Sequence, residues 1–128
     1  MPIAIVRLGV PRMPGEGLRL GTVRHPPRGV KKSEIARRDY FDVWLPLLAP
    51  SRDLMAFAKR SADEGSWKLF ERSFRAEMHR SDVAKVLDLL AALSHETRFS
   101  LGCYCEREER CHRSILRMLL HERGAVFA

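Results

Sequence analysis

The chain has 128 residues, of which 45% are hydrophobic and 30% charged, with a formal net charge of +7 at pH 7. This composition is typical of a soluble globular protein and excludes an intrinsically disordered one, and the length favours a single domain covering residues 1–128. The positive charge favours an anionic partner, namely phosphate, a nucleotide or nucleic acid, although it could serve solubility alone.

Two short strands are predicted in the first part of the chain. Residues 3–8 form an apolar run bounded by Gly9 and Pro11, and residues 18–24 alternate between two faces. The loop between them is short for a crossover, so the two strands could be parallel or could form an antiparallel hairpin. The loop at residues 25–29 (HPPRG) can be neither helix nor central strand, and it could hold an anion or be an ordinary connection.

Positive charge is most concentrated between residues 24 and 38, where Glu34 is the only acidic side chain. We predict that Arg24 and Arg28 bind an anion, because guanidinium groups match phosphate and carboxylate geometry. The cations of this basic patch are Arg24, Arg28, Lys31, Lys32, Arg37 and Arg38.

The middle of the chain is predicted to be mainly helical. A short helix is expected at residues 33–38, and residues 40–48 are expected to pack over the core as a loop or short helix anchored by Trp44. Three amphipathic helices should follow, the first two with N-terminal caps at Ser51 and Ser66 and the third starting at Ser81 with Asp82.

The C-terminal part combines a strand with a final helix. Residues 97–104 read as the last strong strand, and a helix should begin near Cys111 or His112 and end at Gly124. Strands separated by helices predict an α/β fold with a small, mostly parallel sheet flanked by helices in three layers. A parallel crossover would bring Arg24 and the proline loop opposite the cysteines, at the edge where such sheets bind ligands.

All three cysteines lie in residues 103–113 (CYCEREERCHR), which makes this stretch the strongest candidate for chemistry. One alternative is a structural zinc site, whose ligands would be Cys103, Cys105, Cys111 and His112. The Cys-x-Cys spacing is tighter than usual, and adjacent Cys111 and His112 point in different directions on a helix. We therefore expect neither a metal nor an organic cofactor.

The preferred interpretation is thiol chemistry by Cys111, His112 and Arg113, which we take as candidate catalytic residues. A thiolate at a helix N-terminus flanked by cations is stabilised, and the histidine can act as acid or base. A phosphatase-type loop does not fit, because acidic residues lie close by in the sequence. In the purely structural alternative, Cys103 and Cys111 are core residues and Arg113 pairs with Glu106 or Glu109.

Several short motifs, in this order, resemble a known family. They are Arg24 with residues 27–30 (PRGV), residues 49–51 (APS), and Cys103 with residues 111–113 (CHR). Together they are similar to an uncharacterised bacterial domain family with a C-terminal Cys-His-Arg motif, which includes the YeaO-like proteins. The similarity runs from Ile3 to about Gly124. It implies a compact α/β fold and a cytoplasmic bacterial setting, but no established activity.

The chain departs from this family at two positions. Members often carry an acidic residue just before the arginine of the second strand, where this chain has Val23. They also often carry one two places after the first cysteine, where this chain has Cys105.

Two functions follow from these observations. The first is a small enzyme acting on a phosphorylated, nucleotide or nucleic-acid substrate at the Cys-His-Arg site. The second is a non-catalytic nucleic-acid-binding or regulatory module that uses the basic patch. With an odd number of cysteines and no apolar segment long enough for a signal peptide or membrane span, a cytoplasmic protein without a membrane partner is expected. The sequence leaves the oligomeric state open.

Overall fold

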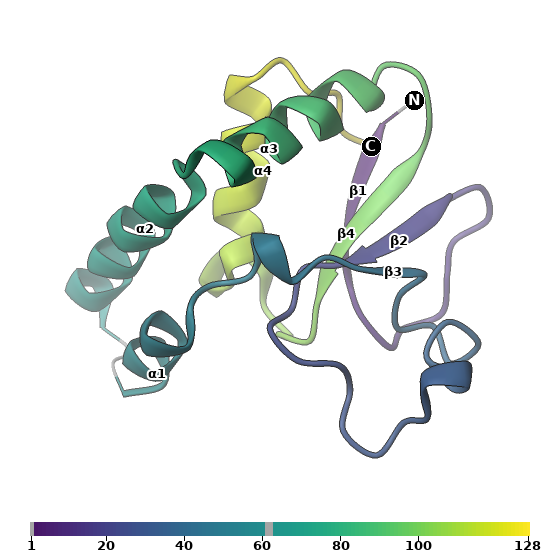
Figure 1. The fold of residues 1–128 in the computed structure, drawn as a ribbon, viewed down its shortest axis with the longest axis horizontal. Coiled ribbons are helices and arrows are strands. Elements are labelled where there is room, and N and C mark those ends of the chain that lie inside the picture. The colour runs from purple at the N-terminus through teal and green to yellow at the C-terminus, as the bar shows by residue number, and fades with distance from the viewer. Residues whose placement is uncertain (1, 61–62) are drawn as a thin grey trace.

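The computed structural model describes residues 2–60 and 63–128 as an all-parallel, four-stranded sheet with four α-helices (Figure 1). This arrangement confirms the predicted α/β fold. The strands are β1 (Ile3–Arg7), β2 (Leu18–Gly21), β3 (Val43–Trp44) and β4 (Phe99–Cys103). The α-helices are α1 (Arg52–Arg60), α2 (Glu64–Met78), α3 (Ser81–Leu93) and α4 (His112–Glu122), and the 3-10 helices are η1 (Lys32–Glu34), η2 (Pro46–Leu48) and η3 (Glu108–Arg110).

Strand β4 is central to the sheet, whose spatial order is β1-β4-β2-β3. It pairs in parallel with β1 and with β2, and Phe99 is opposite both Ile3 and Leu18. All five residues of β4 are buried, as expected for a strand covered on both faces. Because β4 separates β1 from β2, the loop after β1 is a crossover between parallel strands and not a hairpin turn.

The α-helices pack against one face of the sheet and form the main core with it. Leu20 and Leu101 from the sheet meet Phe74 of α2 and Ile115 of α4 in this cluster. The aromatic stripe of α2 follows the helical period, so its larger side chains reach the same face. Burial of such side chains is the dominant stabilising contribution in a domain of this size.

Helix caps agree with the sequence in one case and differ in another. Ser51 Oγ accepts a hydrogen bond from the Leu54 N–H, as expected for a cap of α1. Helix α2 begins earlier than predicted, because Asp63 is its cap and accepts from the Ser66 N–H at 2.7 Å. Asp is as favourable as Ser at the N-cap position, and Ser66 lies within the first turn of the helix.

The opposite face of the sheet is covered by loops, so the described α-helices form one layer and the layer of helices predicted on this side is not formed. A Cβ on Gly102 would lie 2.2 Å from Leu8 Cδ2, and one on Gly21 would lie 2.4 Å from Phe41 Cδ2. The loops therefore approach the sheet so closely that only glycine fits at these two positions. Arg19 is fully buried on this side, where it pairs with Glu16.

Two local predictions were wrong in part. Residues 40–48 do cover the core, because Phe41 and Leu48 are buried and residues 46–48 form the short helix η2. Trp44 is not the anchor of this segment, however, since it lies in β3 at the edge of the sheet and is 43% exposed. Its indole nitrogen is satisfied by donating to the Val23 carbonyl at 2.8 Å. The helix expected over residues 33–38 is limited to the single turn η1.

The parallel register determines where a site can form. The carboxyl ends of β2 and β4 lie next to each other, so the segments that leave them face the same edge. Helix α4 begins nine residues after the end of β4 and returns its N-terminus toward this edge (Figure 1). Among the residues that the structure describes, no helix is both long enough and apolar enough to cross a lipid bilayer.

Candidate active site

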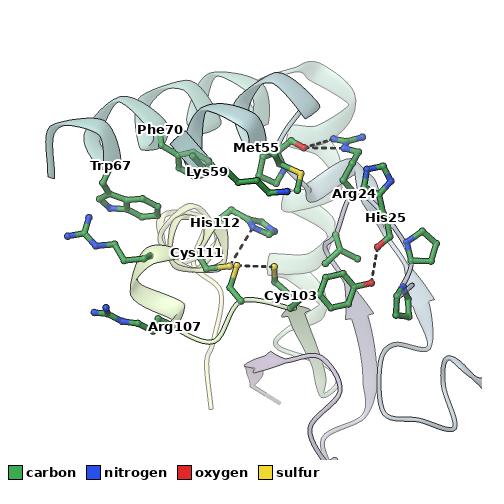
Figure 2. A pocket seen from close by; sticks show the side chains of 18 of the residues that line it. Arg24, His25, Met55, Lys59, Trp67, Phe70, Cys103, Arg107, Cys111 and His112 are labelled. Carbon is green, nitrogen blue, oxygen red and sulfur yellow. Dashed lines mark hydrogen bonds between the residues drawn. The ribbon is translucent and has the colours of Figure 1, made fainter. Parts of the chain in front are cut away.

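A cleft of about 940 Å³ opens at the carboxyl edge of the sheet (Figure 2). Its walls come mainly from three parts of the chain that are distant in sequence: residues 23–28 after β2, residues 55–59 and 63–70 of α1 and α2, and residues 103–112 from the end of β4 to the start of α4. The predicted meeting of Arg24, the proline loop and the cysteine stretch is therefore present. In Figure 2, Cys111 and His112 lie in the middle of the cleft, between Trp67 and Arg24.

The Cys111 sulfur lies between two nitrogen atoms. Cys111 is the residue before the first turn of α4, with extended backbone angles of −122° and 152°. Its Sγ is 3.6 Å from His112 Nδ1 and accepts a hydrogen bond from Arg113 Nε at 3.4 Å. Of the three residues predicted as catalytic, Cys111 and His112 line the cleft, and Arg113 contacts the Cys111 sulfur from the buried side.

The orientation of the His112 ring follows from its contact with β2. Nε2 is 2.6 Å from the Thr22 carbonyl oxygen and 3.1 Å from Thr22 Oγ1. Because a carbonyl oxygen can only accept, Nε2 carries a proton, and the lone pair of Nδ1 faces Cys111. The Thr22 hydroxyl is itself fixed by donating to the Gly102 carbonyl. The ring is therefore held in the tautomer that can take the thiol proton.

Arg113 places a buried positive charge beside the sulfur. The residue is only 3% exposed, and its other nitrogens donate to the carbonyls of Val6 and Cys105. Within residues 2–60 and 63–128 it has no carboxylate partner. The pairing with Glu106 or Glu109 expected in the structural alternative is not formed, since Glu109 binds Arg107 instead. A buried cation without a carboxylate favours an anion next to it, here the thiolate.

Hydrogen bonds among the three thiols set their acidities. The Cys103 thiol donates to Cys105 Sγ at 3.7 Å, and its bonds to Cys105 and Cys111 raise the pKa of Cys103. The bond from Cys103 lowers the pKa of Cys111, the bond to Cys105 and burial raise it, and His112 lowers it, with a net lowering. Bonds from Cys103 and then Cys111 lower the pKa of the exposed Cys105 to about 3. Cys105 and Cys111 therefore share one negative charge, and Cys111 should carry it once the Cys105 thiol is removed, because His112 and Arg113 contact the Cys111 sulfur.

Comparison with known families identifies the domain. A family model described as the active DUF488-N3 subclade matches residues 3–124. The chain belongs to this family. No curated protein and no solved structure matched it. The match covers every element of the cleft and confirms the predicted membership of a domain-of-unknown-function family, while the narrower YeaO-like assignment stays a prediction.

The cysteine cluster of this DUF488-N3 protein was also tested as a metal site. Ligand atoms of Cys103, Cys111 and His112 lie within 4.8 Å of one another, and Cys105 does not join this group. The guanidinium of Arg113 donates directly to the Cys111 sulfur, so a divalent cation bound there would stand beside a buried positive charge. His112 would also have to coordinate through Nδ1, because Nε2 is used by Thr22. These contacts fit thiol chemistry better than a zinc site.

The predicted anion-binding residues of the DUF488-N3 domain both border the cleft. Arg24 is half-buried and donates through Nε and one terminal nitrogen to the carbonyls of Ala49 and Pro50. Arg28 is exposed at the rim. Neither has an acidic partner in the described part of the chain. The rest of the basic patch does not line the cleft, so the patch is divided between two surfaces.

Sequence reasoning missed the residues that complete the cleft from other elements. Lys59 of α1 and Trp67 of α2 lie on its wall, and the Thr22 backbone orients His112. Trp67 follows the helical period of the buried side chains of α2, and this period gives no sign that the residue also borders a cleft. Thr22 and His112 are 90 residues apart, and nothing local in the sequence connects them.

Proposed function

We propose that this protein is a cytoplasmic bacterial enzyme that uses Cys111 as a nucleophile on a phosphorylated, nucleotide or nucleic-acid substrate. The observation that carries the proposal is the position of the Cys111 sulfur, 3.6 Å from a basic histidine nitrogen and 3.4 Å from a buried arginine, on the wall of a large cleft. A nucleophile, a base and a group that orients the base are the arrangement expected for covalent catalysis.

The proposed reaction begins with transfer of the thiol proton to His112 Nδ1. The Cys111 thiolate then bonds to the electrophilic atom of the substrate while the leaving group departs with the proton from Nδ1. A water molecule next attacks the covalent intermediate, gives a proton to Nδ1 and releases the thiolate. The Nε2 proton stays in its hydrogen bond to Thr22 throughout, and Arg113 stabilises the thiolate before attack and after release.

The second candidate, nucleic-acid binding by the basic patch, receives less support. Arg24 and Arg28 face the cleft, and Arg37 contacts Glu34, so Lys31, Lys32 and Arg38 are the exposed remainder. Three exposed cations provide fewer phosphate contacts than most nucleic-acid-binding surfaces use. The division of the patch therefore favours a ligand in the cleft.

A pH profile of alkylation tests the nucleophile. In a Cys105→Ala variant, which removes the exposed thiol, iodoacetamide should modify Cys111 with an apparent pKa below about 8.5, the value of an ordinary thiol. The reason is the hydrogen bond from Cys103 together with the contacts of His112 and Arg113. Mass spectrometry of tryptic peptides identifies the modified cysteine at each pH.

The matched control is Cys105→Ala combined with Cys111→Ser, which leaves only Cys103. Cys103 is buried, and burial alone raises its pKa and limits access of the reagent, so this variant should react slowly over the same pH range. A Cys111 profile with an apparent pKa of about 8.5 or higher would mean that the thiol is not activated, and the proposed chemistry would be wrong.

A further inference from the structure

We propose that the ligand of the cleft is a free nucleoside monophosphate, with its phosphate at Arg24, Arg28 and Lys59 and its base against Trp67. This inference rests on the proposed function only in placing the substrate in the same cleft. It goes further by assigning one chemical class and by orienting it relative to Cys111.

The phosphate end is defined by three cations without acidic partners in the described residues. Arg24 is held by two backbone carbonyls, so its guanidinium is positioned before any ligand arrives. Arg28 and Lys59 are exposed on the same cleft. Figure 2 shows Lys59 between Phe70 and Arg24 along the upper wall. Preorganised arginines with adjacent lysine charge are a common phosphate-binding arrangement.

The base end is formed by aromatic side chains of α2. Trp67 stacks on Phe70 with ring centres 5.2 Å apart and an angle of 13° between the planes. The guanidinium of Arg110 also lies over the Trp67 ring, with its carbon 5.7 Å from the ring centre. Arg110 is 40% exposed and bound to exposed Glu64, so a base can displace this planar group and take its place on the ring.

Acidic side chains do not oppose such a ligand. Asp63 is the only acidic residue among the residues that line the cleft, and its carboxylate accepts the Ser66 N–H as the cap of α2. None of the three glutamates of the cysteine stretch is among the lining residues, and two of them are paired, Glu108 with Arg117 and Glu109 with Arg107. The unpaired charge of the cleft is therefore positive.

The order of the groups favours a mononucleotide over a polymer. Cys111 lies between the aromatic end and the cationic end, so the atom it attacks belongs to the part of the ligand that joins base and phosphate (Figure 2). Only three cations of the cleft, Arg24, Arg28 and Lys59, have no acidic partner among the described residues, whereas a polymer needs a row of them along its backbone. A cleft of about 940 Å³ is in the range of small-molecule sites.

Calorimetry with defined probes tests the assignment. Adenosine 5′-monophosphate should bind at least about 10-fold more tightly than ribose 5-phosphate, which lacks the base, and than adenosine, which lacks the phosphate. The chain has two tryptophans, so Trp44→Phe leaves Trp67 as the only indole. In that variant the monophosphate should quench the fluorescence of Trp67, and ribose 5-phosphate should not.

Matched variants locate the two ends. Arg24→Met and, separately, Lys59→Met should weaken binding of the monophosphate about 10-fold while leaving adenosine unchanged. Arg38→Met, in the same basic patch but outside the cleft, should change neither. Lys59 is exposed and holds no other element, so its replacement tests the assignment even if Arg24→Met does not fold.

The failures of the two proposals are distinguishable. The assignment is wrong if ribose 5-phosphate binds as tightly as the monophosphate, if no probe binds, or if a ten-nucleotide single strand binds more tightly than the monophosphate. Each of these results leaves the alkylation profile of Cys111 untouched. Conversely, monophosphate binding to Cys111→Ser together with an ordinary thiol pKa would support the ligand and overturn the chemistry.

Discussion

Replacing Arg19 with methionine is expected to lower the free energy of unfolding by about 3–5 kcal/mol. Arg19 is 0% exposed and pairs with Glu16 through two nitrogens, at 2.8 and 3.0 Å. It also donates to the carbonyls of Val10 and Asp39, and these two hydrogen bonds hold the loops against the sheet. Methionine fills a similar volume but leaves a buried carboxylate and two carbonyls without donors. Denaturant unfolding at pH 7 measures the loss.

Arg37→Met is the matched control. Arg37 and Glu34 have the same residue types and the same three-residue spacing, but the arginine side chain is 77% exposed. Solvent screens this pair, and its removal should change the free energy of unfolding by less than about 1 kcal/mol. If the two replacements lowered the free energy of unfolding equally, the contribution of the Glu16–Arg19 pair would not depend on its burial.

The same ion pair should make stability depend on pH. Burial opposes ionisation of Glu16, but hydrogen bonds from Arg19, Ser100 and the Met13 N–H outweigh it and lower the pKa of Glu16 to about 2, from 4.5. The folded-state pKa is depressed, so this stabilisation is present above about pH 4.5 and is lost as the pH falls toward 2. Unfolding curves across this range should show the loss in the wild type, and Arg19→Met should show much less of it.

The regular elements could be predicted because their signals are local. The apolar runs at β1 and β4 and the helical periods of α2, α3 and α4 place hydrophobic side chains on one face, and the structure buries those faces. Strand β3 could not be predicted in this way. It has two residues, both side chains are exposed, and it exists because β2 offers a free edge. Its apolar sequence therefore suggested a buried segment.

The site was predictable only where its residues adjoin in sequence. Cys111, His112 and Arg113 stand together at a helix start, and this alone identified them. No local sequence pattern predicts the order of the strands, because β4 lies between β1 and β2 although it comes last in the chain. The Thr22 contact that fixes the histidine tautomer and the wall formed by Lys59 and Trp67 both follow from that order.

Replacing Arg113 with methionine should slow alkylation of Cys111 at pH 7 by about 10-fold or more, measured in the Cys105→Ala background. Arg113 Nε donates to the Cys111 sulfur, and the side chain brings the only buried guanidinium near it among the described residues. Without this donor and its charge, the pKa of Cys111 should rise by about one unit or more, which reduces the thiolate fraction about 10-fold. Arg113→Lys should restore only part of the rate. A lysine ammonium cannot donate at the same time to the Cys111 sulfur and to the carbonyls of Val6 and Cys105, as the planar guanidinium does.

Two comparisons separate this effect from a general loss of structure. Arg117→Met, one turn later on α4, removes a surface contact with Glu108 and should leave the alkylation rate unchanged. The full pH profile of Arg113→Met should be displaced to higher pH with the same plateau rate, since an activated and an ordinary thiolate react at similar speed once formed. A folded Arg113→Met protein with the wild-type profile would show that the buried guanidinium only supports the carbonyls of Val6 and Cys105. Cys111 would then owe its acidity to Cys103 and His112, and Arg113 would have no part in the proposed chemistry.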